Sequence, residues 1–368
     1  MEYNGYLLSG DTMAAQIQYG QIIPLDRSRM PLYLAAGGKL EDWLVSRAID
    51  RHRTNSRILK KVLRLTDSSD LAAVLRVHAA TITDNYWVRL DSEEALTYEN
   101  VRFTEDTFAE VALTGSFSSY SRMYDKAQMT AGSPELTNIG SYEKCWRVKE
   151  NRWYLYKCGT PLERFSELFI ARLGTALGFA MAEYLPEGQF VKTPDFTQGI
   201  YNYEPAAAIV GDEEDYAFNY DRLTALSPAL AKPYLDILYM DALCFNVDRH
   251  TQNYGILRKR TDGSIVGMAP NFDNNITLIS RGYGPDARQT NGFLMDLFEE
   301  LLEERSLSYP IPVLDEAVVG KIAQETLPEA DIDRKYVVDM VLERGQRLVR
   351  KLERFQQQSS SGPTMKIL

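Results

Sequence analysis

The stretch from residue 246 to residue 275, NVDRHTQNYGILRKRTDGSIVGMAPNFDNN, constrains the fold more than any other part of the chain. Two strand-like runs, YGILRKR and SIVGMAP, are separated by TDG, a strong signal for a β-hairpin turn. In an antiparallel hairpin, residues equidistant from the turn lie opposite each other. Asn253 and Asp273 are each ten positions from Gly263, so folding the hairpin should bring them to the same end.

These residues carry oxygen atoms that suit a divalent cation. Asn253 offers an amide oxygen and Asp273 a carboxylate, which are ligands that Mg²⁺ accepts when it holds nucleotide phosphates. Asp248 precedes Asn253 by five residues and should face the same space, where it could orient a hydroxyl for attack on phosphorus. The same side chains could instead cap and turn an ordinary surface hairpin, and the spacing alone does not decide between the two.

A second group of residues favours the phosphate site. Lys157 lies in the strand-like run 153–158 among apolar neighbours, where an unpaired ammonium is costly. Glu167 falls on the first turns of an amphipathic helix, and protein kinases use a strand lysine paired with a helix glutamate to position phosphates. Gly140 and Ser141 open the preceding strand, where a glycine lets the backbone approach a phosphate closely. For Lys157 and Glu167, an ordinary surface ion pair is the alternative.

The order of these features along the chain is more specific than any one of them. A glycine turn, a strand lysine, a helix glutamate, further strands and then helices precede Asp248, Asn253 and Asp273. That is the linear order of the protein-kinase-like fold. We therefore expect an α+β protein of two lobes, with a small mixed β-sheet in the N-lobe and a helical C-lobe, preceded by a helical N-terminal domain. The expected boundaries are 1–125 for the N-terminal domain, 126–204 for the N-lobe, 205–356 for the C-lobe and 357–368 for a disordered tail.

The first 125 residues contain mainly helical patterns, as in LEDWLVSRAI. Residues 47–76 carry eight Lys or Arg against three Asp, an excess of five positive charges. This basic segment is either the solvated face of a packed helical pair or a surface for DNA or another partner. Residues 103–136 are rich in Thr, Ser and Gly and should form a linker or an irregular connection.

Composition bounds the remaining classes of protein. No apolar run approaches the roughly 20 residues of a membrane span, and the N-terminus has no secretory pattern, so we expect a cytoplasmic protein without a membrane partner. The three cysteines are widely spaced and should be reduced core residues, while three histidines are too few for a histidine-built metal site. The net charge of −10 argues against a nucleic-acid coat but leaves room for a local basic patch.

The chain resembles the HipA-type serine/threonine kinases over roughly residues 135–350. The motifs NIGSYEK, WYLYKCG, SELFIARLGTALG, NVDRHTQNYGI and PNFDN carry the resemblance. It implies a protein kinase that uses ATP and Mg²⁺ and phosphorylates itself. By this resemblance Asp248 would be the catalytic aspartate, and Gly140 and Ser141 would lie in the phosphate-binding loop. Lys157 would hold the phosphates, Glu167 would pair with it, and Asn253 and Asp273 would bind the metal.

The resemblance leaves the acceptor and the partners open. In that family an autophosphorylated serine lies three residues before the loop glycine, and Thr137 holds that position here, with Ser141 as the alternative. The first 125 residues resemble the helical N-terminal extension of some HipA-like proteins and not the short barrel of typical members. The protein substrate is unknown, and the basic helices could bind DNA or an antitoxin-like partner. A small-molecule kinase and a non-catalytic, kinase-shaped regulatory module are the alternatives.

Overall fold

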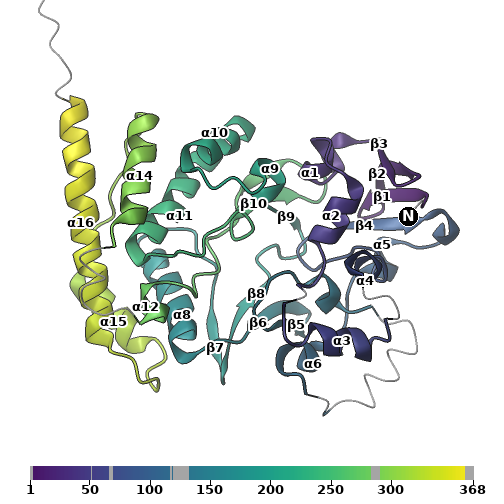
Figure 1. Ribbon diagram of the computed structural model, residues 1–368, viewed down its shortest axis with the longest axis horizontal. Helices are drawn as coiled ribbons and strands as arrows, with labels where there is room; N and C mark the ends of the chain where they lie inside the picture. The colour runs from purple at the N-terminus through teal and green to yellow at the C-terminus, as the bar shows by residue number, and fades with distance from the viewer. Residues whose placement is uncertain are drawn as a thin grey trace, which may run out of the picture. The chain divides into compact units, whose positions relative to one another are not determined.

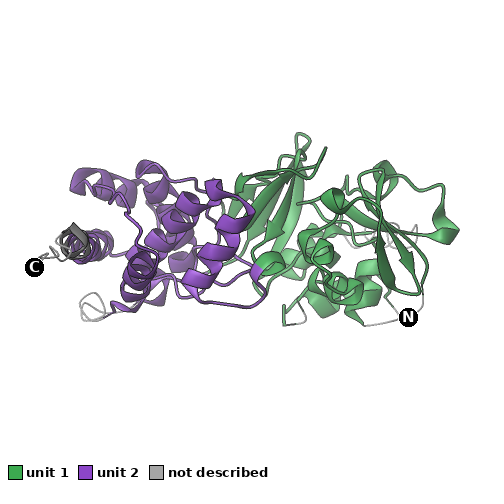
Figure 2. Cartoon of the chain, turned by 90° about the horizontal axis from the view of Figure 1, so that it is seen from above, with its two compact units in different colours: residues 1–159, 184–209, 255–269 green, residues 160–183, 210–254, 270–368 purple. Residues whose placement is uncertain are grey.

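The computed structural model of the protein describes residues 3–50, 52–65, 69–116, 118, 132–282 and 291–360. The chain divides into two compact units (Figure 2). Unit 1 contains residues 1–159, 184–209 and 255–269, and unit 2 contains residues 160–183, 210–254 and 270–368. Both units are therefore built from segments that are distant in the sequence.

The N-terminal part of unit 1 contains an antiparallel sheet with the strand order β3-β2-β1-β4 (Figure 1). The strands are β1 (Gly5–Ser9), β2 (Thr12–Gln18), β3 (Gln21–Pro24) and β4 (Tyr86–Leu90). A hydrophobic core that includes Leu7, Ile17, Leu44 and Val88 packs against the sheet. The expectation that residues 1–125 are helical missed this sheet, because its strands are short and β4 joins β1 from far along the chain.

The helices of this part are short. They are α1 (Leu32–Ala35), α2 (Leu40–Ser46), α3 (Ser56–Val62), α4 (Asp70–Leu75), α5 (Tyr98–Val101) and α6 (Ala109–Thr114), with 3-10 turns η1 (Arg27–Arg29), η2 (Asp91–Glu93) and η3 (Pro134–Thr137). Helix α6 corrects the expectation of an irregular connection over 103–136, because its residues Val111 and Ala112 are buried. Residues 117 and 119–131 of that segment lie outside the described residues.

Unit 1 contains two further antiparallel sheets. The first has the strand order β5-β6-β8-β7 and the second β11-β10-β9. The strands are β5 (Lys144–Lys149), β6 (Arg152–Lys157), β7 (Leu185–Glu187), β8 (Phe190–Pro194), β9 (Tyr201–Pro205), β10 (Gly255–Lys259) and β11 (Ile265–Met268). Their pairing is antiparallel, so the N-lobe sheet is not mixed as expected. The tight turn between β5 and β6 uses Glu150 and Asn151, both with positive φ.

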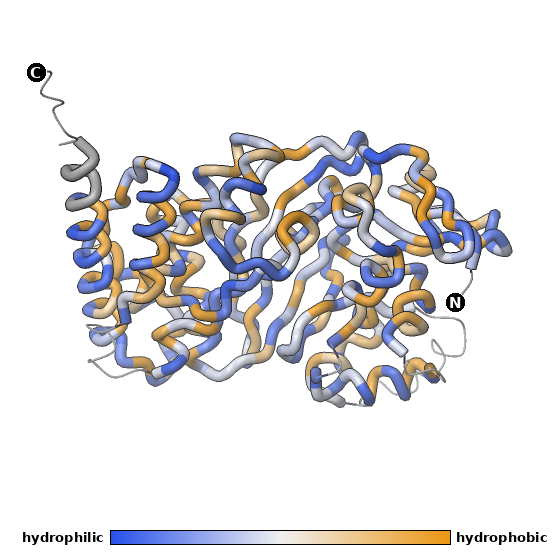
Figure 3. Tube along the Cα trace, turned by 45° about the horizontal axis from the view of Figure 1, so that its top comes forward, coloured by the Kyte–Doolittle hydropathy of each residue, from blue (hydrophilic) through white to orange (hydrophobic). Residues whose placement is uncertain are grey.

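Unit 2 is helical. Its helices are α8 (Pro161–Ala176), α10 (Tyr216–Leu226), α11 (Ala231–Cys244), α12 (Leu278–Arg281), α14 (Phe293–Glu304), α15 (Glu316–Glu325) and α16 (Arg334–Ser360), with the 3-10 turn η4 (Pro228–Leu230); the short α9 (Ala207–Val210) links the units in sequence. Figure 3 shows hydrophobic and hydrophilic residues alternating along these helices, as expected for amphipathic helices. No helix among the described residues is long and apolar enough to cross a membrane.

Two local features define the ends of unit 2 helices. Helix α8 begins with a capping box, in which Thr160 accepts from the backbone nitrogen of Glu163 and the Glu163 carboxylate accepts from that of Thr160. At the other end of the chain, α16 continues to Ser360, so residues 357–360 are helical and not part of a disordered tail. Residues 361–368, for which disorder was also expected, lie outside the described residues.

Candidate functional site

The segment after α11 forms a tight loop in unit 2. Phe245 ends the helix in a left-handed conformation with a φ of 53°. The amide oxygen of Asn246 accepts a hydrogen bond from the backbone nitrogen of Asp248 at 3.1 Å. The backbone carbonyl of Asp248 accepts one from Nδ2 of Asn253 at 3.0 Å. These two bonds hold Asp248 and Asn253 in one compact turn.

Arg249 is the centre of this loop. Its side chain is 3% exposed and forms a bidentate ion pair with Asp241 of α11, with two N–O distances of 2.9 Å. Its Nη1 also donates to the backbone carbonyls of Asn253 and Phe272, each at 2.8 Å. Because the two carbonyls share one nitrogen, the backbones that carry them lie side by side. Asp273 directly follows Phe272, so Arg249 brings the segments of Asn253 and Asp273 together.

The register of the β10–β11 hairpin differs from the symmetry about Gly263 that the sequence predicts. If the strands continued in the observed register, Asn271 and not Asp273 would lie opposite Asn253. The expected symmetry about Gly263 is wrong because the turn is centred ahead of that glycine and a bulge follows. Asp273 itself has a left-handed φ of 62°, which bends the chain, and its carbonyl accepts from Nδ2 of Asn246 at 3.4 Å.

Helix α8 holds the residue that follows Asp273. The Glu167 carboxylate accepts from the backbone nitrogen of Asn274 at 2.8 Å, and Ser166 Oγ donates to the backbone carbonyl of Asn274 at 2.7 Å. The Asn274 side chain accepts from Arg249 Nη2 at 2.8 Å. Asp273 therefore sits between an arginine-bound and a helix-bound segment, and its position is strongly determined.

Asp248 lies in an electrostatically unusual place for a carboxylate. It is half-buried, and burial is the main factor that raises its pKa above the ordinary value, with the nearby Asp273 acting in the same direction. His250 and Arg249 oppose the rise. A carboxyl whose pKa is raised by a neighbouring carboxylate marks a site of negative charge, which favours a bound cation.

The donor set of this cluster fits Mg²⁺ in character. A carboxylate and an amide supply hard oxygen atoms, and Mg²⁺ commonly takes only one or two protein ligands and completes its shell with phosphates and water. Among the described residues, no group of three His, Cys, Asp or Glu side chains is placed to hold a metal by itself. A cation at Asn253 and Asp273 would therefore depend on a further ligand, such as a phosphate.

The other expected site residues belong to unit 1, with the exception of Glu167. Lys157 ends β6 and is 5% exposed, and its ammonium lies over the ring of Tyr184 at 5.7 Å. Gly140 has a φ of +109°, a conformation that favours glycine, and the adjacent Ser141 is exposed. Because Lys157 and Glu167 belong to different units, their pairing stays a prediction.

The two hydroxyls considered for phosphorylation differ in access. Thr137 is 5% exposed, and its Oγ1 donates to the backbone carbonyl of Ala80 at 2.7 Å. Ser141 lies on the exposed part of the loop. A phosphate on Thr137 would require the loss of a buried hydrogen bond, whereas one on Ser141 would not.

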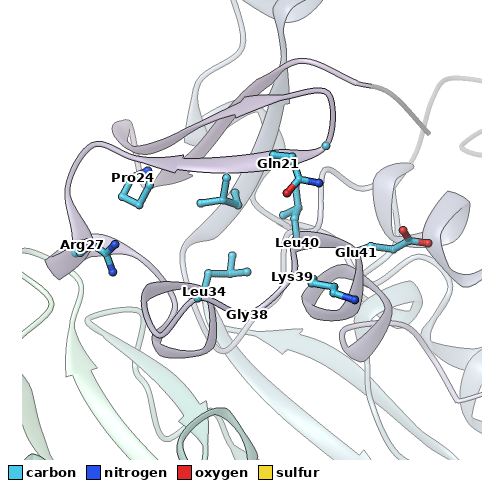
Figure 4. Close-up of a pocket in the computed structure, with 11 residues that line it drawn as sticks. Gln21, Pro24, Arg27, Leu34, Gly38, Lys39, Leu40 and Glu41 are labelled. Atoms are coloured by element: carbon cyan, nitrogen blue, oxygen red, sulfur yellow. The ribbon is translucent and has the colours of Figure 1, made fainter.

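A separate pocket of about 300 Å³ lies in the N-terminal part of unit 1. Figure 4 shows its lining residues, which come from β3 and the residue before it, the turn at Arg27, helices α1 and α2 and the segment between these helices. None of them is an expected site residue. The pocket carries both signs of charge, with Arg27, Lys39 and Glu41 at its wall.

Two buried residues support the site from behind the candidate ligands. Arg249 and Asp241 are not among the candidate site residues that the sequence pattern indicates. Both are buried and paired with each other. The signal was present in the amide-rich runs at both ends of the hairpin, since Asn246, Asn271 and Asn274 all join the arginine-centred network.

Comparison with known proteins gives a likeness in structure alone. No protein-family model and no curated protein sequence matches the chain. Among solved structures, the proinflammatory kinase CtkA of Helicobacter pylori is 19% identical, with a TM-score of 0.46 over 59% of this chain and 95% of that one. HipA of Shewanella oneidensis, solved in a complex with HipB and operator DNA, is 13% identical. It has a TM-score of 0.54 over 95% of this chain and 97% of that one.

The match to HipA extends over nearly the whole of both chains, so it includes the N-terminal part of unit 1 as well as the kinase-like part. At this level of identity it establishes the architecture. The antiparallel sheets of unit 1 and the helices of unit 2 are those of a kinase-like α+β protein. The chain has a HipA-like kinase fold.

Proposed function

We propose that the protein is a phosphotransferase that uses ATP and Mg²⁺ and phosphorylates serine or threonine hydroxyls of a protein, including its own. The observation that carries this proposal is the arginine-centred cluster, in which Arg249 brings the backbones of Asn253 and Asp273 together beside Asp248. An ordinary surface hairpin, whose polar residues only cap and turn the chain, would not require a buried bidentate ion pair at its open end. The kinase-like fold supports the same conclusion.

In this proposal each residue has a distinct role. Asn253 and Asp273 would hold the metal, which supplies charge neutralisation for the phosphates when it is bound. Asp248 would accept a hydrogen bond from the acceptor hydroxyl and orient it, and its half-buried position favours that task over free solvation. Lys157 and the backbone at Gly140 and Ser141 would bind the phosphates, with Glu167 as the expected partner of Lys157.

The exposed Ser141 is the better candidate for self-phosphorylation, because Thr137 is buried with its hydroxyl bonded. The acceptor in other proteins is not specified by these residues. A small-molecule acceptor is possible on the same fold, since a fold does not determine a substrate.

The Asp248→Asn variant tests the central role. It keeps the size of the side chain and removes its charge, so phosphate transfer from labelled ATP should fall by about a hundredfold or more, while ATP binding survives. Asp212→Asn is a matched control, since Asp212 is an exposed aspartate of the same unit. Transfer by Asp248→Asn at the parent rate would exclude Asp248 as the catalytic residue.

A second candidate function is regulation through DNA or an antitoxin-like protein. The HipA structure contains HipB and operator DNA, which supports the idea for a protein of the same fold. The basic segment is weaker evidence than its charge suggests, because Arg47 is paired with Asp84 at 2.8 Å and Arg53 is 1% exposed. Retention on DNA that falls steeply with salt would favour this function, and no retention at low salt would exclude the DNA part.

A further inference from the structure

One buried arginine holds both ends of the loop at residues 139–143. Arg53 is 1% exposed, and it comes from the turn that precedes α3 in the N-terminal part of the chain. Its guanidinium donates to the backbone carbonyl of Asn138 at 3.0 Å, just before the loop, and to that of Lys144, just after it. It also lies 3.9 Å from the carboxylate of Glu143, the last residue of the loop.

A buried carboxylate repeats this pattern. Glu135 is 1% exposed and accepts from Nδ2 of Asn138 at 2.9 Å, before the loop. It also accepts from the backbone nitrogen of Trp146 at 2.6 Å, after the loop. Arg53 and Glu135 lie 3.9 Å apart, so each partly neutralises the other in a place where an isolated charge would be unstable. The base of the loop is thus held twice by one pair of opposite charges.

The tip of the same loop is open to solvent. Ile139 is 43% exposed, Ser141 is exposed, and Gly140 has a left-handed backbone. A left-handed residue in a turn can direct successive backbone N–H groups toward an anion, and the exposed tip leaves room for one. Fixing such a loop in advance lowers the entropy lost when a ligand binds.

We propose that Arg53 and Glu135 are positioning residues of the phosphate-binding loop, which hold its two ends so that the backbone at Gly140 and Ser141 is ready for the phosphates of a nucleotide. This inference rests on the proposed function and deepens it. It makes the N-terminal part of the chain a working part of the nucleotide site, beyond any role in partner binding.

A purely structural ion pair would behave differently. If Arg53 only stabilised the core of unit 1, its loss would weaken all ligand binding to the same extent, or none of it. If it positions the loop, its loss weakens the binding of phosphates and leaves the binding of the nucleoside part unchanged. Comparing ATP with adenosine separates the two cases.

The test uses Arg53→Lys in the full chain, with Arg57→Lys as the matched control. Lysine keeps the charge but cannot donate to both carbonyls in the planar geometry of the guanidinium. Arg57 is an exposed residue of α3, so the same chemical change there should have no effect. Binding of ATP with Mg²⁺, and of adenosine, is measured by calorimetry after thermal unfolding shows that each variant is folded.

We expect Arg53→Lys to weaken ATP binding by about tenfold, the effect of one hydrogen bond of a charged group, and to change adenosine binding by less than about twofold. Asn138→Ala, which removes one bond to Glu135 and keeps Arg53 in place, should give the same selective loss at about threefold. If Arg53→Lys does not fold, the Asn138→Ala variant is used for the test instead.

Three results would contradict the proposal in distinguishable ways. Unchanged ATP binding in Arg53→Lys and Asn138→Ala, with a parent chain that binds ATP, would overturn this inference alone. Equal losses for ATP and adenosine would reduce Arg53 to a structural role. A parent chain that binds adenosine and not ATP would overturn the proposed function, and the loop assignment with it.

Discussion

At the scale of single residues, three buried arginines hold separate parts of the chain together. Arg249, Arg53 and Arg258 each donate to a backbone carbonyl of a segment that is distant in sequence, and each faces a buried carboxylate. An arginine suits this task because its planar guanidinium has five donors in a fixed geometry. Removing any one of them would leave a buried carboxylate without its counter-charge, which costs about 3–5 kcal/mol.

The buried carboxyl of Glu135 should make the stability of the protein depend on pH. Burial raises the pKa of its carboxyl from 4.5 to about 7, against the opposing effect of Arg53. A group whose pKa is raised on folding stabilises the fold fully below its unfolded value, and that contribution is lost as the pH rises through the folded value. The free energy of unfolding should therefore fall between about pH 5 and pH 7, by on the order of 3 kcal/mol for this group.

Glu135→Gln provides the comparison, because it keeps the shape and does not titrate. Urea unfolding of the parent and of the variant at several pH values should show the parent losing stability relative to the variant over this range. The same difference at pH 5 and pH 8 would mean that Glu135 keeps an ordinary pKa. Arg53 and Lys144 are the positive charges that act on this carboxyl, so neither should be altered in the experiment.

At the scale of elements, the β10–β11 hairpin is bonded to the N-terminal part of unit 1. Arg258 on β10 donates to the backbone carbonyls of Met30 and Ser28 and pairs with Glu204 on β9. At the turn, Gly263 packs so closely that a Cβ there would lie 1.8 Å from the carbonyl oxygen of Ser28. The two strands lead directly into the segments that carry Asn253 and Asp273.

We expect Gly263→Ala to destabilise the protein by at least about 1 kcal/mol, because it adds a clash to a left-handed backbone with a φ of +73°. Gly267→Ala is the matched control in the same hairpin, since a Cβ at Gly267 meets nothing within 4 Å. Its effect should stay within about 0.5 kcal/mol. Urea unfolding measures both, and equal effects would show that the turn does not depend on its contact with Ser28.

At the scale of the whole molecule, the N-terminal part of the chain is joined to the later strands by buried polar bonds within unit 1. Glu204 accepts from the backbone nitrogen of Leu32 at 2.6 Å and from the hydroxyl of Tyr86 at 2.9 Å. Asn202 accepts from the backbone nitrogen of Asn85 at 2.9 Å. These bonds, with those of Arg53 and Arg258, join residues 1–125 to the later segments of unit 1. A domain boundary after residue 125 stays a prediction.

A chain of residues 126–360 should therefore not fold by itself. It would lack Met30, Leu32 and Tyr86, which are hydrogen-bond partners of the buried Arg258–Glu204 pair. It would also lack Arg53, which is bonded to the backbone at both ends of the loop at residues 139–143. Circular dichroism and thermal unfolding, against a matched chain of residues 1–360, should show no cooperative transition for the shorter one. A cooperative transition at the temperature of the longer chain would show that residues 126–360 fold without residues 1–125.

The sequence determined the local parts of this protein. Hydrophobic periodicity and turn residues were sufficient to predict β5, β6, α8 and the β10–β11 hairpin, because these elements depend on neighbours a few residues apart. The order of the chemical residues predicted a kinase-like fold, and the resemblance of the quoted motifs implied the HipA-like fold that the structural comparison supports. The roles of Asp248, Asn253 and Asp273 in catalysis and metal binding stay predictions.

Tertiary structure alone decided the rest. The N-terminal sheet depends on β4 pairing with β1, and such long-range pairing leaves little trace in a local pattern. The hairpin register, the left-handed Asp273 and the arginines that hold separate segments depend on which buried groups must be satisfied once the chain is compact. A buried donor needs an acceptor wherever the fold supplies one, and sequence spacing cannot reveal where that is.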